Sequence, residues 1–188
     1  MTTNVNHIKV SMMNKEDIHD IIDYWHSSSD SYLESMGVDL SKLPSPKDLL
    51  NYLESQAELP LSEKTSFALI WWSDGKKIGH CNLNQIVFGE QAQLHLHIWD
   101  SSIRKKGIGS KLILKSLESF FGNMKLKKIY CEPYALNDAP NRTLKKVGFT
   151  FVKKHTTIPG SINFEQEVNQ WEMTFEKFKE LEISQRVH

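Results

Sequence analysis

The chain has 188 residues, of which 39% are hydrophobic and 24% are charged, proportions typical of one globular domain with a substantial core. Lysine plus arginine and aspartate plus glutamate each number 23, so no excess of positive charge indicates nucleic acid or an anionic membrane as a partner. The sequence has neither a signal-peptide core nor a long apolar run, so we expect a single cytoplasmic domain spanning residues 1–188.

The first predicted elements are two helices. Asn14 followed by Asp17 indicates a helix cap, and apolar residues at helical spacing predict a helix over residues 15–26. Ser45, with proline in the first turn after it, predicts a second helix. The serine-rich segment between the two helices is read either as a substrate lip or as an ordinary connection.

From Thr65 onward the pattern changes to strands. A turn at Asp74-Gly75 predicts a hairpin, and a second turn near Gly89 leads into a third strand. In that strand leucine and isoleucine alternate with His95, His97 and Trp99, so its two faces meet different surroundings. Cys81 and Cys131 lie far apart in strand-like contexts and predict buried reduced thiols, rather than a disulfide framework or a zinc site.

A basic glycine loop follows this strand and precedes a predicted amphipathic helix that Gly122 closes. Glycine lets consecutive amide N–H groups point at one anion, and the first turn of a helix adds unpaired donors and a positive dipole end. The loop therefore predicts pyrophosphate binding, although an ordinary basic turn stays an alternative. The dinucleotide fingerprint is excluded because Leu112 replaces its third glycine, and the Walker motif is absent. The residues predicted to bind are Arg104, Lys105, Lys106, Gly107, Ile108, Gly109 and Ser110.

The remaining elements are shorter. A strand over residues 127–131 ends before Pro133, and the helix that connects it to the preceding strand implies that the two strands are parallel. A helix is predicted from Asn137 to Gly148. Two more strands are expected, one around residues 151–158 and one that contains Trp171, Met173 and Phe175.

Two motifs together carry a resemblance to a known family. Arg-x-x-Gly-x-Gly between a strand and a helix resembles the acetyl-CoA-binding motif of the GNAT superfamily of acyl-CoA-dependent N-acyltransferases. Asn137 and Gly148-Phe149 keep the spacing of a second superfamily motif. The resemblance covers most of the chain and implies an α+β GNAT fold, with a mixed, mostly antiparallel central sheet flanked by helices on both faces.

The resemblance also implies the activity, the acetyl-CoA-dependent acetylation of a primary amine of a small molecule by direct attack on the thioester. Acetyl-CoA is the expected cosubstrate, and no metal is expected because the His95 and His97 pair lacks a third ligand nearby. The backbone of the strand before the loop, at Ile98 and Trp99, would hold the pantetheine and the acetyl oxygen. Asn137 and Asn141 would hydrogen-bond the pantetheine amides, while helix capping is the alternative for Asn137.

The catalytic residues are harder to assign from the sequence. Residues 131–137 are similar to a stretch of aminoglycoside 6'-N-acetyltransferases and of siderophore-type lysine acyltransferases, where a carboxylate lies beside the acceptor amine. Glu132 is therefore the first candidate for the general base, ahead of His97 and His95, each of which is also read as a packing residue. Many family members use a tyrosine acid where this chain has Leu144, so Tyr134 is the nearest candidate acid, with Cys131 or water as alternatives.

Two other functions stay open at this level. One is a protein N-terminal or lysine acetyltransferase, whose cleft would admit an extended peptide between the first helices and the last strand pair. The other is a non-catalytic acyl-CoA-binding protein, suggested by the missing tyrosine. A homodimer formed through exposed strands is also compatible with the sequence.

Overall fold

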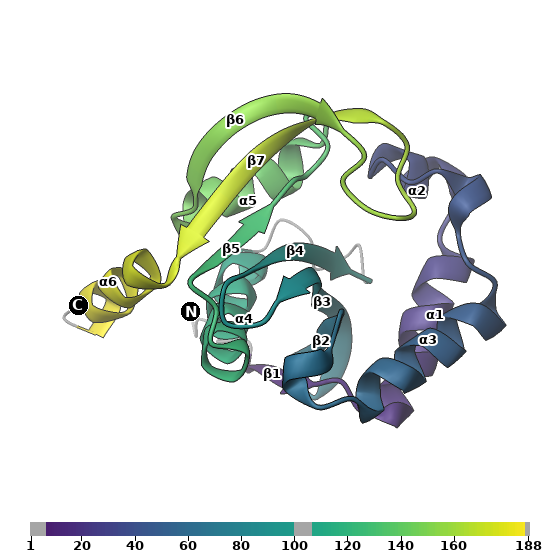
Figure 1. Cartoon of the computed structure of the whole chain (residues 1–188), viewed down its shortest axis with the longest axis horizontal. Helices are drawn as coiled ribbons and strands as arrows, with labels where there is room; N and C mark the ends of the chain where they lie inside the picture. The colour runs from purple at the N-terminus through teal and green to yellow at the C-terminus, as the bar shows by residue number, and fades with distance from the viewer. Residues whose placement is uncertain (1–6, 100–106, 187–188) are drawn as a thin grey trace, which may run out of the picture.

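The computed structural model describes residues 7–99 and 107–186, which fold around a seven-stranded sheet of order β1-β2-β3-β4-β5-β7-β6 (Figure 1). The strands are β1 (Ile8–Met12), β2 (Phe67–Ser73), β3 (Lys76–Val87), β4 (Gln91–Ile98), β5 (Lys128–Cys131), β6 (Thr150–Thr157) and β7 (Gln166–Thr174). Among the strands of the described residues, only the β4–β5 pair is parallel, and the other neighbours are antiparallel. The mixed, mostly antiparallel α+β fold predicted from the sequence is confirmed.

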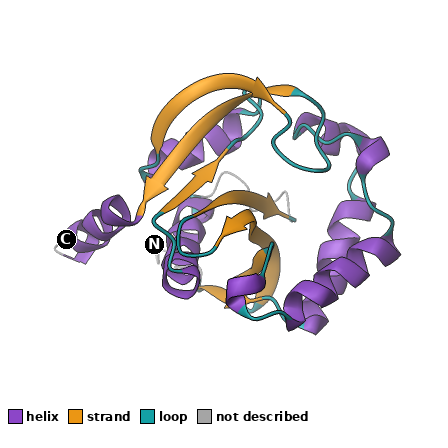
Figure 2. Cartoon of the chain, in the orientation of Figure 1, coloured by secondary structure: helices purple, strands orange, loops and turns teal. Residues whose placement is uncertain are grey.

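Helices lie on both faces of this sheet (Figure 2). The α-helices are α1 (Ile18–Ser27), α2 (Asp30–Ser35), α3 (Pro46–Glu58), α4 (Ile108–Met124), α5 (Asp138–Val147) and α6 (Phe175–Arg186). Three 3-10 turns are η1 (Lys15–Asp17), η2 (Leu40–Lys42) and η3 (Leu61–Glu63). None of the helices described is both long and apolar enough to cross a membrane.

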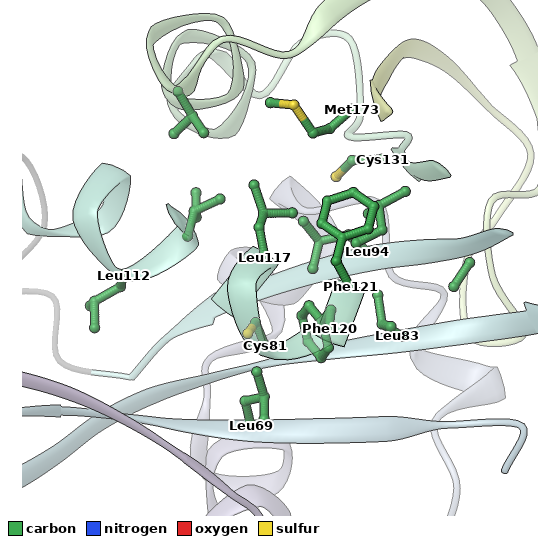
Figure 3. Packing of buried hydrophobic residues seen from close by; sticks show 14 of the residues in the cluster. Leu69, Cys81, Leu83, Leu94, Leu112, Leu117, Phe120, Phe121, Cys131 and Met173 are labelled. Carbon is green, nitrogen blue, oxygen red and sulfur yellow. The ribbon is translucent and has the colours of Figure 1, made fainter. Parts of the chain in front are cut away.

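Strand β2 has one core on each of its faces. Leu69 and Trp71 point toward α4, where Leu117 and Phe120 of that helix are fully buried (Figure 3). Ile70 points the other way and packs with α1 and α3. Truncating a fully buried leucine such as Leu117 to alanine costs about 2–5 kcal/mol, so each such contact between the sheet and α4 contributes substantially to stability.

The predicted caps and turn are present. The Asn14 side chain accepts hydrogen bonds from the Glu16 and Asp17 amides, and Asp17 accepts one from the Asn14 amide, which completes a capping box. Ser45 caps α3. The hairpin turn at residues 74–75 has the two positive φ angles, 49° and 78°, of a type I′ turn.

Several elements differ from the prediction. β1, α2 and α6 were not predicted, because β1 is a five-residue edge strand, α2 has only six residues, and α6 has weak apolar periodicity. Helix α4 passes Gly122 and ends at Met124, whose side chain is fully buried, and Lys125 adopts the left-handed conformation after it. Phe175 begins α6 instead of extending the last strand.

The parallel strands β4 and β5 separate after a short paired segment. Their register joins residues 91–93 to residues 128–130. Beyond it β4 continues along β3, and β5 continues along β7 (Figure 1). The sheet therefore opens into a V between β4 and β5, and this opening positions the candidate site.

Candidate active site

Three cavities meet at the opening between β4 and β5. The first, called here the cofactor cavity, measures about 680 Å³ and lies between β4, the start of α4, and α5. The acceptor cavity, about 430 Å³, lies between strands β3 and β4, helices α1 and α3, and residues 160–163. The reaction gap, about 100 Å³, lies between the separated ends of β4 and β5. Met36 lines all three, so the cavities adjoin one another at this residue.

The described part of the predicted phosphate loop, residues 107–110, borders the cofactor cavity. Gly107, Gly109 and Ser110 line it, and Gly107 has a φ of +74°, which favours glycine. A Cβ built on Gly109 would lie 3.9 Å from Ile98 Cδ1 and would point into the same space. The Ile108 side chain is buried in the core, so only its backbone can contribute to binding. The predicted Arg104, Lys105 and Lys106 lie outside the described residues.

Two cations at this cavity were missed by the sequence reasoning. Arg142 and Lys146 lie one turn apart on α5, and both line the cofactor cavity opposite the start of α4. Their i, i+4 spacing on the helix that begins at Asn137 was the signal that could have identified them. A pyrophosphate at the α4 N-terminus would therefore meet backbone donors from one helix and cations from another.

The strand period decides which β4 groups face the cofactor. The Trp99 amide donates to Ile78 O in β3 over 2.9 Å, and the Trp99 indole donates to His80 Nδ1 over 2.8 Å. Because backbone groups alternate along a strand, the amides of Leu96 and Ile98 face the separated β5 side. Ile98 lines the cofactor cavity, and its contact with pantetheine stays a prediction. The placement of Trp99 at the cofactor is wrong, because both its amide and its indole point elsewhere.

Glu132 lies at the reaction gap, two residues beyond the last β4–β5 pair. Its side chain is 11% exposed. Gln93 Nε2 donates to Glu132 Oε2 over 3.3 Å, and His155 Nε2 lies 3.4 Å from Oε1. Burial raises the pKa of the Glu132 carboxyl, while the positive charges of His155 and Lys153 oppose this shift. A carboxyl with a raised pKa in a gap of this kind suits a general base.

The orientation of Gln93 is fixed by a chain of amides. Gln85 Nε2 donates to Gln93 Oε1 over 2.9 Å, and the Tyr130 hydroxyl donates to Gln85 Oε1 over 3.1 Å. Since its oxygen accepts from Gln85, Gln93 presents its NH₂ group to Glu132. The chain therefore holds the carboxylate at the edge of the gap.

Of the other predicted site residues that follow β5, Tyr134 and Asn137 border the reaction gap and Asn141 does not. Tyr134 and Asn137 line the reaction gap, and the Asn137 side chain makes no capping bond to α5. Asn141 is occupied internally: its Nδ2 donates to Tyr134 O and Asn137 O, and its Oδ1 accepts from Asn169 and Trp171. With all four hydrogen-bonding positions in use, the Asn141 side chain holds α5 against β7 and offers nothing to pantetheine.

His97 and His95 both face the acceptor cavity and the reaction gap. The His97 ring stacks on His80 at 4.6 Å between centroids, and its Nδ1 lies 3.3 Å from the Tyr24 hydroxyl. Burial lowers the pKa of His95 to about 4 and of His80 to about 3, and it holds the pKa of His97 well below its usual value. All three imidazoles are therefore neutral near pH 7.

Two further observations concern the chemistry of the described residues. Cys81 and Cys131 are buried free thiols, as predicted, and burial raises the pKa of each to about 12. Within residues 7–99 and 107–186, no group of three or more histidine, cysteine or carboxylate side chains is placed to hold a metal ion.

Separated parallel strands beside a glycine-bearing helix N-terminus agree with the resemblance of the sequence to acyl-CoA-dependent N-acyltransferases. A model of the acetyltransferase (GNAT) family matches residues 24–149, and the chain belongs to this family. It is an acyltransferase that uses acetyl-CoA as cosubstrate. No curated protein sequence matches the chain.

Solved structures with the same fold include enzymes for different acceptors. The spermidine N-acetyltransferase of Vibrio cholerae, in complex with CoA and spermine, aligns with a TM-score of 0.74 at 16% identity, over 92% of this chain and 98% of that chain. The aminoglycoside acetyltransferase AAC(6')-Ib in complex with coenzyme A aligns with a TM-score of 0.70 at 17% sequence identity. The alignment covers 94% of this chain and 99% of that chain. The ribosomal L7/L12 alpha-N-protein acetyltransferase RimL in complex with coenzyme A aligns with a TM-score of 0.72 at 11% sequence identity. The alignment covers 90% of this chain and 95% of that chain.

Proposed function

We propose that this protein transfers the acetyl group of acetyl-CoA to the primary amine of a small molecule by direct attack on the thioester. The cofactor cavity supports the donor, because it combines the α4 N-terminus with Arg142 and Lys146 on α5. The reaction gap lies between this cavity and the acceptor cavity, so the amine can reach the thioester there. Cys131 borders the gap, but burial raises the pKa of its thiol and keeps it protonated, so it is a poor nucleophile. This arrangement supports direct transfer without a covalent acyl-enzyme.

Glu132 is the proposed general base. A primary amine arrives protonated near neutral pH, so a proton must leave its nitrogen before attack. The C–N bond then forms, negative charge develops on the acetyl oxygen, and the C–S bond breaks. The β4 amide at Leu96 faces the side on which that oxygen would lie, and a hydrogen bond from such an amide stabilises the developing charge.

The departing thiolate needs a proton, and two tyrosines are placed to supply it. Tyr134 lines the reaction gap and is the acid that we propose from the strand end. Tyr32 lines the cofactor cavity and lies in a chain with the Tyr24 hydroxyl at 3.3 Å, which in turn lies 3.3 Å from His97 Nδ1. Leu144, which stands where many family members have the tyrosine acid, is fully buried in the core and lines none of the three cavities in the described residues.

One observation favours a small molecule over a protein as acceptor. The path for an extended peptide would run between the first helices and the β6–β7 loop, and hydrogen bonds close this path. Asn163 Nδ2 and Gln166 Nε2 both donate to Gly37 O over 2.8 Å, and the Asp39 amide donates to Ile162 O over 2.8 Å. We call this contact between residues 37–39 and 162–166 the latch. Figure 1 shows the β6–β7 loop reaching the α2 segment there.

Three further expectations belong to this proposal. The continuous sheet and its shared cores support one domain over residues 1–188. A homodimer through a sheet edge is supported by β6, an edge strand that exposes Phe151 and Val152 by 50% and 45%. A cytoplasmic location is proposed from the sequence alone. Sedimentation of the purified protein tests the homodimer.

The decisive experiment incubates the protein with acetyl-CoA and a broad panel of amines and peptides, with mass detection of acetylated products and measurement of released CoA. We expect acetylation of small primary amines and no turnover of peptides. Peptide acetylation at comparable rates would support the protein acetyltransferase instead. If acetyl-CoA raises the melting temperature but no acceptor is modified, the protein is a non-catalytic acyl-CoA-binding protein.

A further inference from the structure

The described lining of the acceptor cavity carries very little charge. Its single carboxylate is Asp48, and no lysine or arginine side chain contributes. Asp48 is exposed, and its Oδ2 accepts a hydrogen bond from Ser45 Oγ over 2.6 Å at the start of α3. The carboxylate is thus at the rim of the cavity, and it is already engaged in the helix cap.

The helical wall of this cavity is apolar and aromatic. Helices α1 and α3 present Ile21, Trp25, Leu49, Tyr52 and Leu53 to it. A hydrocarbon or aromatic body that covers this wall gains about 25 cal/mol for each Å² of apolar surface removed from water. The wall therefore favours an acceptor whose body is apolar.

The strand floor of the cavity is polar but neutral. His80, His95 and His97 lie there with pKa values lowered by burial, and Asn82 lies beside them. His95 Nε2 is buried and has no hydrogen-bond partner among the described residues. Because His95 borders both the acceptor cavity and the reaction gap, an N–H of the attacking nitrogen is well placed to supply that partner.

We propose that the acceptor is a monoamine with an apolar or aromatic body, an inference that rests on the proposed function. Its amine would lie in the reaction gap at Glu132 and His95, and its body would lie against α1 and α3. A second ammonium group deep in this cavity would lose its hydration without a carboxylate of the described lining beside it, because Asp48 lies at the exposed rim, and this loss is costly. The substrate class therefore differs from spermine and from aminoglycosides, each of which carries several amines.

The test compares heptylamine and 1,6-diaminohexane, two acceptors of equal length. The far end of heptylamine is a methyl group, whereas the far end of 1,6-diaminohexane is an ammonium group. Phenethylamine, spermidine and kanamycin extend the series. We expect kcat/KM for heptylamine to exceed that for 1,6-diaminohexane by at least about 10-fold, a difference of about 1.4 kcal/mol. A ratio of one or less overturns the proposal. Acetylation of the polyamines alone overturns the monoamine class and leaves the N-acetyltransferase function intact, whereas no acetylation of any amine overturns both.

A charge placed in the cavity gives a second test. Tyr52 is 43% exposed on α3, so Tyr52→Glu adds a carboxylate to the cavity wall at a position that the fold tolerates. We expect this variant to shift the ratio toward the diamine by about 5-fold or more, by analogy with close charge pairs in partly buried sites. Asn51→Glu adds the same charge to the same helix outside the cavity lining and is the matched control. A ratio that stays at the wild-type value in Tyr52→Glu, with an unchanged melting temperature, overturns the proposal.

Discussion

Gln93 Nε2 donates a hydrogen bond to Glu132 Oε2 over 3.3 Å, from the last residue of β4 that still pairs with β5. The bond links the two strands just where they separate. The carboxylate is therefore held at the apex of the V, between the cofactor cavity and the acceptor cavity, by the same sheet geometry that opens the site.

Replacing Glu132 with glutamine removes the proposed base at nearly constant volume. We expect kcat to fall by about 10²–10⁴-fold, the usual contribution of general base catalysis, with the affinity for acetyl-CoA unchanged. Steady-state kinetics and calorimetry measure the two quantities. Glu172→Gln is the matched control, since Glu172 lies on β7 in an ion pair with Lys128 and does not line the reaction gap. If kcat survives in Glu132→Gln, the base must be sought at His97, His95 or water.

The pH dependence of kcat follows from the environment of Glu132. Burial raises the pKa of this carboxyl. Because a general base must be ionised to accept a proton, we expect kcat to fall as the pH decreases through the raised pKa of Glu132. Lys153 lowers that pKa by its charge, so Lys153→Met should move the acid limb of the pH profile to higher pH. Lys154→Met is the control, because Lys154 pairs with Glu167 and does not act on Glu132. Equal profiles for the wild type and Lys153→Met would argue against Glu132 as the titrating base.

The latch over the site depends on a glycine. Gly37 has a φ of +86°, and a Cβ there would lie 2.1 Å from Gln166 Oε1, so Gly37→Ala combines backbone strain with a steric clash. Gly75→Ala isolates the strain, since Gly75 has a φ of +78° and open space around its Cβ position. We expect Gly75→Ala to cost about 1 kcal/mol of unfolding free energy, and Gly37→Ala to cost about 1–3 kcal/mol more. Denaturant unfolding measures both, and equal losses would mean that the latch yields to the added methyl group.

The two glycines of α4 offer a matched pair for the cofactor. A Cβ on Gly109 points into the cofactor cavity, whereas Gly122 lies exposed near the other end of the helix with nothing within 4 Å. We expect Gly109→Val to weaken acetyl-CoA binding by at least about 10-fold in calorimetry, a loss of about 1.4 kcal/mol, and Gly122→Val to leave binding unchanged. Wild-type affinity in Gly109→Val would contradict the placement of the pyrophosphate at the start of α4.

Two phenylalanine variants assign the acid. Removal of the hydroxyl that protonates the thiolate should lower kcat by about 10²-fold or more and leave the KM for acetyl-CoA unchanged. Tyr134→Phe tests the residue in the reaction gap, and Tyr32→Phe tests the chain through Tyr24 to His97. Each variant is the control for the other, and the affected one should also lose the alkaline limb of the wild-type pH profile. If both retain full kcat, water protonates the leaving thiolate.

Much of the fold could be predicted from interactions between residues close in the sequence. The Asn14 capping box, the Asp74-Gly75 turn and the Gly148 helix end each depend on residues close in sequence, and all three are present as predicted. The end of α4 was misplaced because burial of Met124 in the core outweighs the local preference of Gly122 to stop a helix. The strand β1 escaped prediction since its pairing with β2 joins segments about sixty residues apart.

The candidate site also combines features that depend on neighbouring residues with features that depend on the tertiary structure. By itself the sequence determined the family and the donor, and it predicted the phosphate loop, because a strand, a glycine loop and a helix start are contiguous in the chain. Only the tertiary structure decided that the Trp99 indole binds His80, that the Asn141 side chain is occupied, and that Arg142 and Lys146 line the same cavity as Gly107 and Gly109. The acceptor cavity is likewise a tertiary property, since its walls come from α1, α3, the central strands and the loop before β7. Its charge and shape arise from side chains that meet only after folding, and no local pattern encodes them.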